Sequence, residues 1–231
     1  MMSVSHSKGA TAVQSFPAIQ VKVCGLTRAD EAAACAQAGA RAIGCVFYPK
    51  SPRRVDDSAA GAIRRALPPD VLCVGVFVDE SFDTIMSSVS RTGFTAVQLH
   101  GRETPELVQQ LRGEGLFVIK ALFAGRAPGI EAAPQYSTSA FLVECGRGAL
   151  PGGNAQTWEW SKAAPLGKRH PLILAGGLTP ENAAQAADEA SPDAIDVSSG
   201  VEASPGRKDI RKVIQFIAAV SSANARRTIF L

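Results

Sequence analysis

Short, continuously apolar runs alternate with amphipathic runs along most of this chain. The apolar runs cover residues 19–24, 41–47, 71–78, 95–99, 116–122, 140–143, 172–175 and 194–197. Between them, apolar residues recur at helical spacing, as in the stripe of Phe82, Ile85, Met86 and Val89. Because the apolar runs do not alternate with polar residues, we expect parallel strands that are buried on both faces and joined by helical crossovers.

Eight such units predict a single (β/α)8 barrel, the TIM barrel, and 231 residues suffice for one. The competing architecture is an open doubly wound sheet, which usually carries a G-x-G-x-x-G turn after its first strand. The sequence at that point is Cys24–Gly25–Leu26–Thr27, which does not supply the turn. The pattern therefore favours the barrel.

The barrel is expected to span residues 19–222. A loose N-terminal tail over 1–18 precedes it, and a C-terminal tail over 223–231 either docks on the barrel or hangs free. The stretches 124–134 and 146–153 are rich in glycine and proline, so we expect short or irregular helices after the fifth and sixth strands.

Composition narrows the class of protein. The formal net charge of +3 is small and the basic residues are scattered, which argues against a nucleic-acid partner. No apolar run approaches membrane-spanning length, and the first 16 residues lack the apolar core of a secretory signal. Five widely spaced cysteines favour reduced thiols in a cytoplasmic enzyme. The chain has no H-E-x-x-H, C-x-x-C or Walker A pattern, so we expect neither a metal nor a bound nucleotide triphosphate.

Polar residues at the carboxyl ends of the strands are the candidates for chemistry, because that end of a barrel carries the active site. They are Cys24, Arg53, Asp79, His100, Lys120, Glu144 and Asp196. Asp79 precedes a predicted helix and is interpreted as its cap. His100 is either a strand-end histidine with satisfied hydrogen bonds or a catalytic one. Lys120 either touches the substrate or pairs with a neighbouring carboxylate.

Two of these residues suit acid–base catalysis. Cys24 is followed by a glycine that leaves room for a ligand, and its thiolate could act as a base. The alternative is a buried structural thiol, which fits Cys35, Cys45 and Cys73 better. Glu144 follows an apolar strand, where a carboxyl group of raised pKa would suit a general acid.

Small residues follow the last two strands. Gly176 and Gly177 end the seventh, while Ser198, Ser199 and Gly200 end the eighth. Such turns expose backbone N–H groups, and the loops after strands seven and eight of a barrel commonly bind phosphate. We therefore expect a small phosphate ester as the substrate.

Several motifs together resemble a known family. They are VKVCGLT (21–27), GCVFYPKSPRRV (44–55), VGVFVDE (74–80), VQLHG (97–101), LAGGLTPEN (174–182) and IDVSSGVEASPGRKD (195–209). In this order they resemble the N-(5′-phosphoribosyl)anthranilate isomerases of tryptophan biosynthesis, and the resemblance extends to about residue 216.

The resemblance implies an Amadori rearrangement without a cofactor. It implies that Cys24 is the general base, that Arg53 holds the anthranilate carboxylate and that Asp196 lies beside the substrate. The phosphate would be bound by backbone amides of the two turns described above, with help from the loop after strand six, including Gly152 and Gly153.

The chain departs from the family pattern after strand six. The family usually has an aspartate as general acid where this chain has Glu144, and the following turn reads Gly152–Gly153–Asn154–Ala155. The longer side chain reaches about 1.5 Å further. We expect Glu144 to serve as the acid, with the altered loop compensating for its length.

Two other functions stay open. One is a related phosphosugar isomerase of histidine biosynthesis, or an isomerase for both substrates, although those relatives pair two aspartates and this chain offers Cys24. The other is a non-catalytic barrel that binds a phosphosugar. The sequence is compatible with a monomer or a homodimer.

Overall fold

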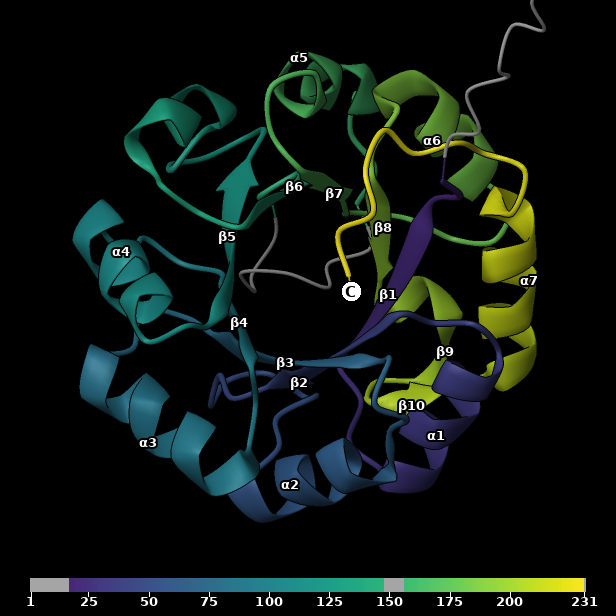
Figure 1. Cartoon of the computed structure of the whole chain (residues 1–231). Helices are drawn as coiled ribbons and strands as arrows, with labels where there is room; N and C mark the ends of the chain where they lie inside the picture. Colours follow the sequence, from purple (N-terminus) through teal and green to yellow (C-terminus); the bar gives the residue numbers. More distant parts are fainter. Residues whose placement is uncertain (1–16, 148–155, 231) are drawn as a thin grey trace, which may run out of the picture.

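The computed structural model describes residues 17–147 and 156–230, and its centre is a closed barrel of eight parallel strands in sequence order (Figure 1). The strands are β1 (Gln20–Cys24), β2 (Ala42–Val46), β3 (Leu72–Phe77), β4 (Ala96–Leu99), β5 (Phe117–Phe123), β6 (Ala140–Glu144), β7 (Leu172–Leu174) and β8 (Ala194–Val197). Strand β8 pairs with β1, which closes the ring. The predicted barrel is confirmed, and each strand falls within or beside a predicted apolar run.

Helices surround the barrel and connect its strands (Figure 1). The α-helices are α1 (Ala29–Gln37), α2 (Asp57–Ala66), α3 (Phe82–Thr92), α4 (Pro105–Gly113), α5 (Ala164–Gly167), α6 (Ala183–Ala190) and α7 (Ile210–Val220). Short 3-10 helices are η1 (Ile130–Gln135), η2 (Trp160–Ala163) and η3 (Ser199–Val201). The connection after β5 thus contains only the short helix η1. The described part of the connection after β6 contains only η2 and the short α5. The glycine and proline content of both connections predicted such short helices.

The cap assigned to Asp79 is wrong. Ser81 is the N-cap of α3, where its hydroxyl accepts a hydrogen bond from the Thr84 amide. Asp79 instead has a positive φ of 54° and accepts a hydrogen bond from the amide of Arg102 at 2.6 Å. It therefore joins the loop after β3 to the loop after β4, a contact 23 residues apart that no local pattern reveals.

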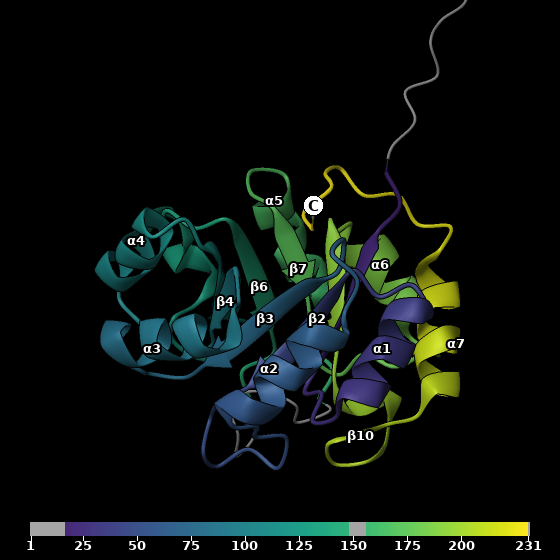
Figure 2. The same cartoon turned by 60° about the horizontal axis from the view of Figure 1, so that its bottom comes forward.

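The barrel interior is apolar towards the amino ends of the strands, where the C-terminal segment closes it. Inward-facing residues such as Ala42, Ile119 and Ile173 form one buried cluster, and Ile229 and Phe230 from the C-terminal segment belong to it. This segment crosses the barrel mouth at the amino ends of the strands, opposite the end that carries β10 (Arg207–Lys208) (Figures 1 and 2). The C-terminal tail therefore docks on the barrel.

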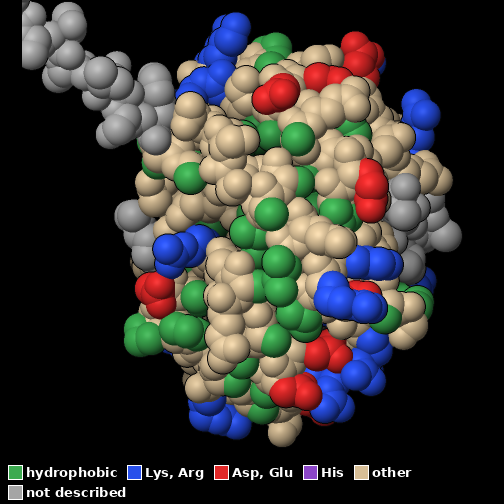
Figure 3. Space-filling model, turned by 90° about the vertical axis from the view of Figure 1, so that its right-hand side faces the viewer, with side chains coloured by type: hydrophobic (Ala, Val, Ile, Leu, Met, Phe, Trp, Pro, Cys, Tyr) green, Lys and Arg blue, Asp and Glu red, His purple; other side chains and the backbone are tan. Residues whose placement is uncertain are grey.

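The outer face formed around α7 and its neighbours carries small hydrophobic side chains along its middle and charged groups mainly towards its edges (Figure 3). Ile214 is the exposed large hydrophobic residue of the described chain, with 52% of its surface accessible. Among the described residues, no helix has the length and apolar character needed to cross a membrane.

Candidate active site

The carboxyl-terminal half of the barrel interior is polar. Residues whose side chains share this end are Lys22 and Cys24 of β1, Gln98 and His100 at β4, Glu144 of β6, and Asp196 and Ser198 at β8. All but Ser198 have less than 9% of their surface accessible. Inward and outward side chains alternate along a strand, so residues two apart on β1, β4 and β8 occupy the same interior.

Cys24 ends β1 and lies directly over Gly44 of β2. The two residues are partners in the strand register, and a Cβ added at Gly44 would lie only 2.7 Å from the Cys24 Sγ atom. The same Cβ would lie 3.2 Å from the Lys22 Nζ atom. The absence of a side chain at position 44 thus creates the space that the thiol and the ammonium group occupy.

Burial raises the pKa of the Cys24 thiol, because the charged thiolate is poorly solvated inside the barrel. The positive charges of Lys22 and Lys208 lower this pKa, and the carboxylate of Asp196 raises it. Lys22 is fully buried and its Nζ atom is 2.8 Å from Asp196 Oδ1. Burial would lower the pKa of Lys22, but Asp196 and Cys24 outweigh it and leave the pKa raised.

Glu144 lies at the end of β6 with 5% of its surface accessible. His100 Nε2 is 3.4 Å from its Oε1 atom, and His100 Nδ1 is 2.8 Å from the side-chain amide of Gln98. Oε1 itself is buried and has no hydrogen-bond partner among the described residues. The carboxyl group therefore has an oxygen available to a ligand in the interior.

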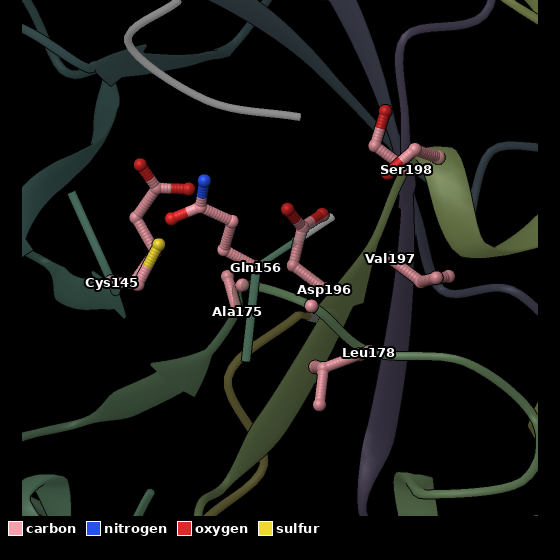
Figure 4. A pocket seen from close by; sticks show the side chains of 11 residues that line it. Cys145, Gln156, Ala175, Leu178, Asp196, Val197 and Ser198 are labelled. Carbon is pink, nitrogen blue, oxygen red and sulfur yellow. The ribbon is translucent and has the colours of Figure 1, made fainter. Parts of the chain in front are cut away.

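A cleft extends from Glu144 to the turns after β7 and β8. Its lining includes Glu144, Gln156, Gly176, Gly177, Asp196, Ser198 and Ser199. Figure 4 places the Gln156 and Asp196 side chains side by side in it, with Ser198 beyond. Gly176 and Gly177 have φ values of 92° and 69°, which turn the chain sharply at the end of β7. The cleft thus combines a carboxyl group with backbone amides suited to an anion.

Of the residues predicted to bind phosphate, four line this cleft: Gly176, Gly177, Ser198 and Ser199. Gly200 does not, because it packs against the backbone carbonyl of Leu178, where a Cβ would have no room. Gly152 and Gly153 lie outside the described residues.

Arg53 is held by a bidentate ion pair. Its Nε and Nη2 atoms each donate to one oxygen of Glu202 at 2.8 Å. Glu202 begins the β9 (Glu202–Ser204) and β10 hairpin, and it also accepts from Lys208 at 2.9 Å. The Arg53 side chain crosses Gly25, where a Cβ would lie 2.5 Å from its Cδ atom. Arg53 is therefore fixed over Gly25, the residue that follows Cys24, and its Nη1 atom donates no hydrogen bond to any described residue.

Lys120 lies away from this site. Its fully buried ammonium group is 2.7 Å from Glu103 and donates to the carbonyl of Gly101 at 2.9 Å. Of the two interpretations above, the structure favours pairing with a carboxylate. The cations that face Cys24 are instead Lys22 and Lys208, which the sequence analysis missed. Lys22 had a detectable signal, because it precedes Cys24 by two residues on the same strand.

No cluster of histidine, cysteine, aspartate or glutamate suited to a metal ion is present in residues 17–147 and 156–230. The cleft is lined by carboxylates and by the backbone of two turns, and the Cys24 thiol and Arg53 lie at the same end of the barrel. These groups suit proton transfer on an anionic organic substrate.

Comparisons with known proteins agree with this chemistry. A family model described as N-(5′-phosphoribosyl)anthranilate (PRA) isomerase matches residues 21–219. A relative of that name from Desulfatibacillum aliphaticivorans is 53% identical over 199 residues, which cover 86% of this chain and 91% of the relative.

Solved structures of phosphoribosyl anthranilate isomerases are also similar to this chain. Phosphoribosyl anthranilate isomerase from Thermus thermophilus is 35% identical, with a TM-score of 0.80 over 88% of this chain and 99% of that one. A second structure, in complex with reduced 1-(o-carboxyphenylamino)-1-deoxyribulose 5-phosphate, is 38% identical, with a TM-score of 0.76 over 87% of this chain and 98% of that one.

Proposed function

The chain belongs to the N-(5′-phosphoribosyl)anthranilate isomerase family, and on that premise we propose how its residues act in tryptophan biosynthesis. The enzyme converts N-(5-phosphoribosyl)anthranilate to 1-(2-carboxyphenylamino)-1-deoxyribulose 5-phosphate by an Amadori rearrangement. The observation that carries the assignment of roles is one barrel end at which the Cys24 thiol lies near a cleft lined by the Glu144 carboxyl group and by two glycine- and serine-rich turns.

The substrate is anchored at both ends. Its phosphate binds the amides of Gly176–Gly177 and Ser198–Ser199, which line the cleft. Its anthranilate carboxylate is bound by the Nη1 side of Arg53, whose other nitrogens are held by Glu202. Because both anchors come from turns at the same barrel end, the ribose lies between them.

Glu144 is the general acid. Its carboxyl group donates a proton to the ribose ring oxygen, the C1′–O bond breaks, and a protonated Schiff base forms. The available Oε1 atom in the cleft supports this role. His100, with Nε2 at 3.4 Å, helps to orient the carboxyl group.

Cys24 is the general base. Its thiolate takes the C2′ proton, and the electron pair of that bond moves towards the positively charged nitrogen to give an enolamine. The enolamine then becomes the ketone when C1′ gains a proton and the C2′ hydroxyl loses one. Apart from cleavage of the C1′–O bond, whose electron pair goes to the ring oxygen as that oxygen is protonated, every step is a proton transfer. Atoms and charges therefore balance within the substrate and these two residues.

We place the enzyme in the cytoplasm, since the five cysteines are free thiols. Whether it acts as a monomer or a homodimer stays a prediction.

Genetic rescue of a tryptophan auxotroph that lacks this isomerase tests the function. The wild type and a Cys35→Ser control should restore growth, because Cys35 is a buried thiol in α1, outside the site. Cys24→Ser and Glu144→Gln should not. Purified Glu144→Gln should keep its affinity for a reduced product analogue while turnover is lost. Near-normal turnover would assign the acid role to another residue, and failure of the wild type to rescue would refute the function.

A further inference from the structure

A fully buried ammonium group shares the barrel interior with Cys24. Lys22 has no accessible surface, and its only anionic partner among the described residues is Asp196, 2.8 Å away on β8. The two residues are partners in the β1–β8 register, so their side chains lie next to each other on the interior face of the barrel. Burying an ion pair in this way is costly and adds little to stability compared with apolar residues of the same size.

The position of this pair argues for a role in catalysis. Lys22 lies on the same face of β1 as Cys24, and both side chains fill the space above Gly44. Asp196 faces Lys22 on one side and lines the substrate cleft on the other. The ion pair therefore connects the thiol to the cleft.

A base must lose its proton before it can act, and the environment of Cys24 opposes this. Burial disfavours the thiolate, and the phosphate and carboxylate of a bound substrate add negative charge. The charged groups that face Cys24 are Lys22 on its own strand, Asp196 on β8 and Lys208 on β10. Next to Lys208, the charges of Arg53 and Glu202 offset each other in an ion pair. Cys45 on β2 adds no charge, because its raised pKa keeps it as the neutral thiol.

Of the groups that lower the pKa of the Cys24 thiol against the effect of burial, Lys22 has the largest influence. Its positive charge favours the thiolate more strongly than the carboxylate of Asp196 disfavours it. Lys208 contributes less, and its Nζ atom is already bound to Glu202 and to the carbonyl of Ser198.

Resting on the role given above to Cys24, we propose that Lys22 is a positioning residue of this reaction, whose ammonium group, anchored by Asp196, stabilises the thiolate of Cys24. Asp196 keeps the lysine charged and in place at the cleft wall. The pair is thus part of the proton-transfer machinery, rather than only a link between β1 and β8.

The test is a titration of the thiol in the substrate-free enzyme. The ultraviolet absorbance of the Cys24 thiolate is measured against pH as the difference between each enzyme and the same enzyme carrying Cys24→Ser. We expect Lys22→Met to raise the thiol pKa by about one unit or more, which leaves about tenfold less thiolate at neutral pH. Lys22→Gln, which removes the positive charge but can still donate a hydrogen bond to Asp196, should raise it in the same direction.

Lys120→Met is the matched control. Lys120 is as deeply buried as Lys22 and has an equally close carboxylate partner, but it lies on the outer side of β5. Its replacement should lower stability without moving the thiol titration. In Lys22→Met, the base limb of the kcat/KM profile should shift with the thiol, so that activity returns at high pH.

An unchanged thiol titration in Lys22→Met or in Lys22→Gln would overturn the inference. The Lys120→Met control separates loss of the charge at position 22 from general loosening of the barrel, and Lys22→Gln suffices if Lys22→Met does not fold. A Cys24→Ser enzyme with normal turnover would instead refute the base role itself.

Discussion

Replacing Phe230 with alanine tests whether the C-terminal segment is part of the barrel core. The Phe230 ring has 4% of its surface accessible, belongs to the interior cluster and lies 6.5 Å from the ring of Phe117. The backbone of the segment is held separately, because the Gln20 side chain donates to the Phe230 carbonyl at 2.7 Å and accepts from the Phe230 amide at 2.8 Å. The substitution therefore removes packing and leaves these hydrogen bonds in place.

The expected cost follows from that burial. Truncating a buried phenylalanine to alanine costs about 3–5 kcal/mol, and the lower end applies here because the barrel mouth can partly close. A chain of this size loses about 2–4 °C of Tm per kcal/mol, so we expect Tm to fall by about 6–12 °C. Activity at low temperature should be unchanged, because Phe230 lies at the barrel end opposite the cleft.

Thermal and urea unfolding measure this effect, with Ile214→Ala as the control. Ile214 is 52% exposed on α7, and truncating it should change the free energy of unfolding by about 0.5 kcal/mol or less. If Phe230→Ala were as mild as this control, the segment would not be part of the core. A large loss of activity at full folding would contradict the separation of the two barrel ends.

Three further predictions concern the site. Gly44→Ala should displace the Cys24 thiol and lower kcat on the order of 10²-fold. Gly113→Ala is the control and should keep wild-type kinetics, because a Cβ at that position would contact no other atom. Arg53→Lys cannot form the bidentate pair with Glu202 and should raise KM by about tenfold while kcat changes less; steady-state kinetics would contradict this if kcat alone fell. Burial would raise the pKa of Glu202, but Arg53 and Lys208 outweigh burial and lower this pKa. The ionised Glu202 therefore stabilises the fold fully above about pH 4.3, the pKa of an unperturbed glutamate. This stabilisation is lost as the pH falls through the lowered pKa. The free energy of unfolding, measured against pH, should therefore fall less on acidification in Glu202→Gln than in the wild type. An identical fall in both proteins would show that Glu202 does not contribute to it.

Much of the architecture could be predicted from the sequence. Continuous apolar runs such as 140–143 are typical of strands buried on both faces, and eight of them with helical connections favour a barrel. Because parallel strands present their carboxyl ends at one edge, Cys24, Glu144 and Asp196 could be assigned to one end without any knowledge of their contacts. Strand period and chain order suffice for such statements.

Contacts between distant residues were decided only by the tertiary structure. Lys22 and Asp196 are 174 residues apart, and Arg53 and Glu202 are 149 apart. Gln20 reaches Phe230 across 210 residues. Local pattern carries no information about such pairs, because they depend on the register in which β8 closes against β1 and on where the last segment crosses the barrel. The sequence by itself determined which residues belong to the active end of the barrel, and closure of the barrel decided which charge lies beside which.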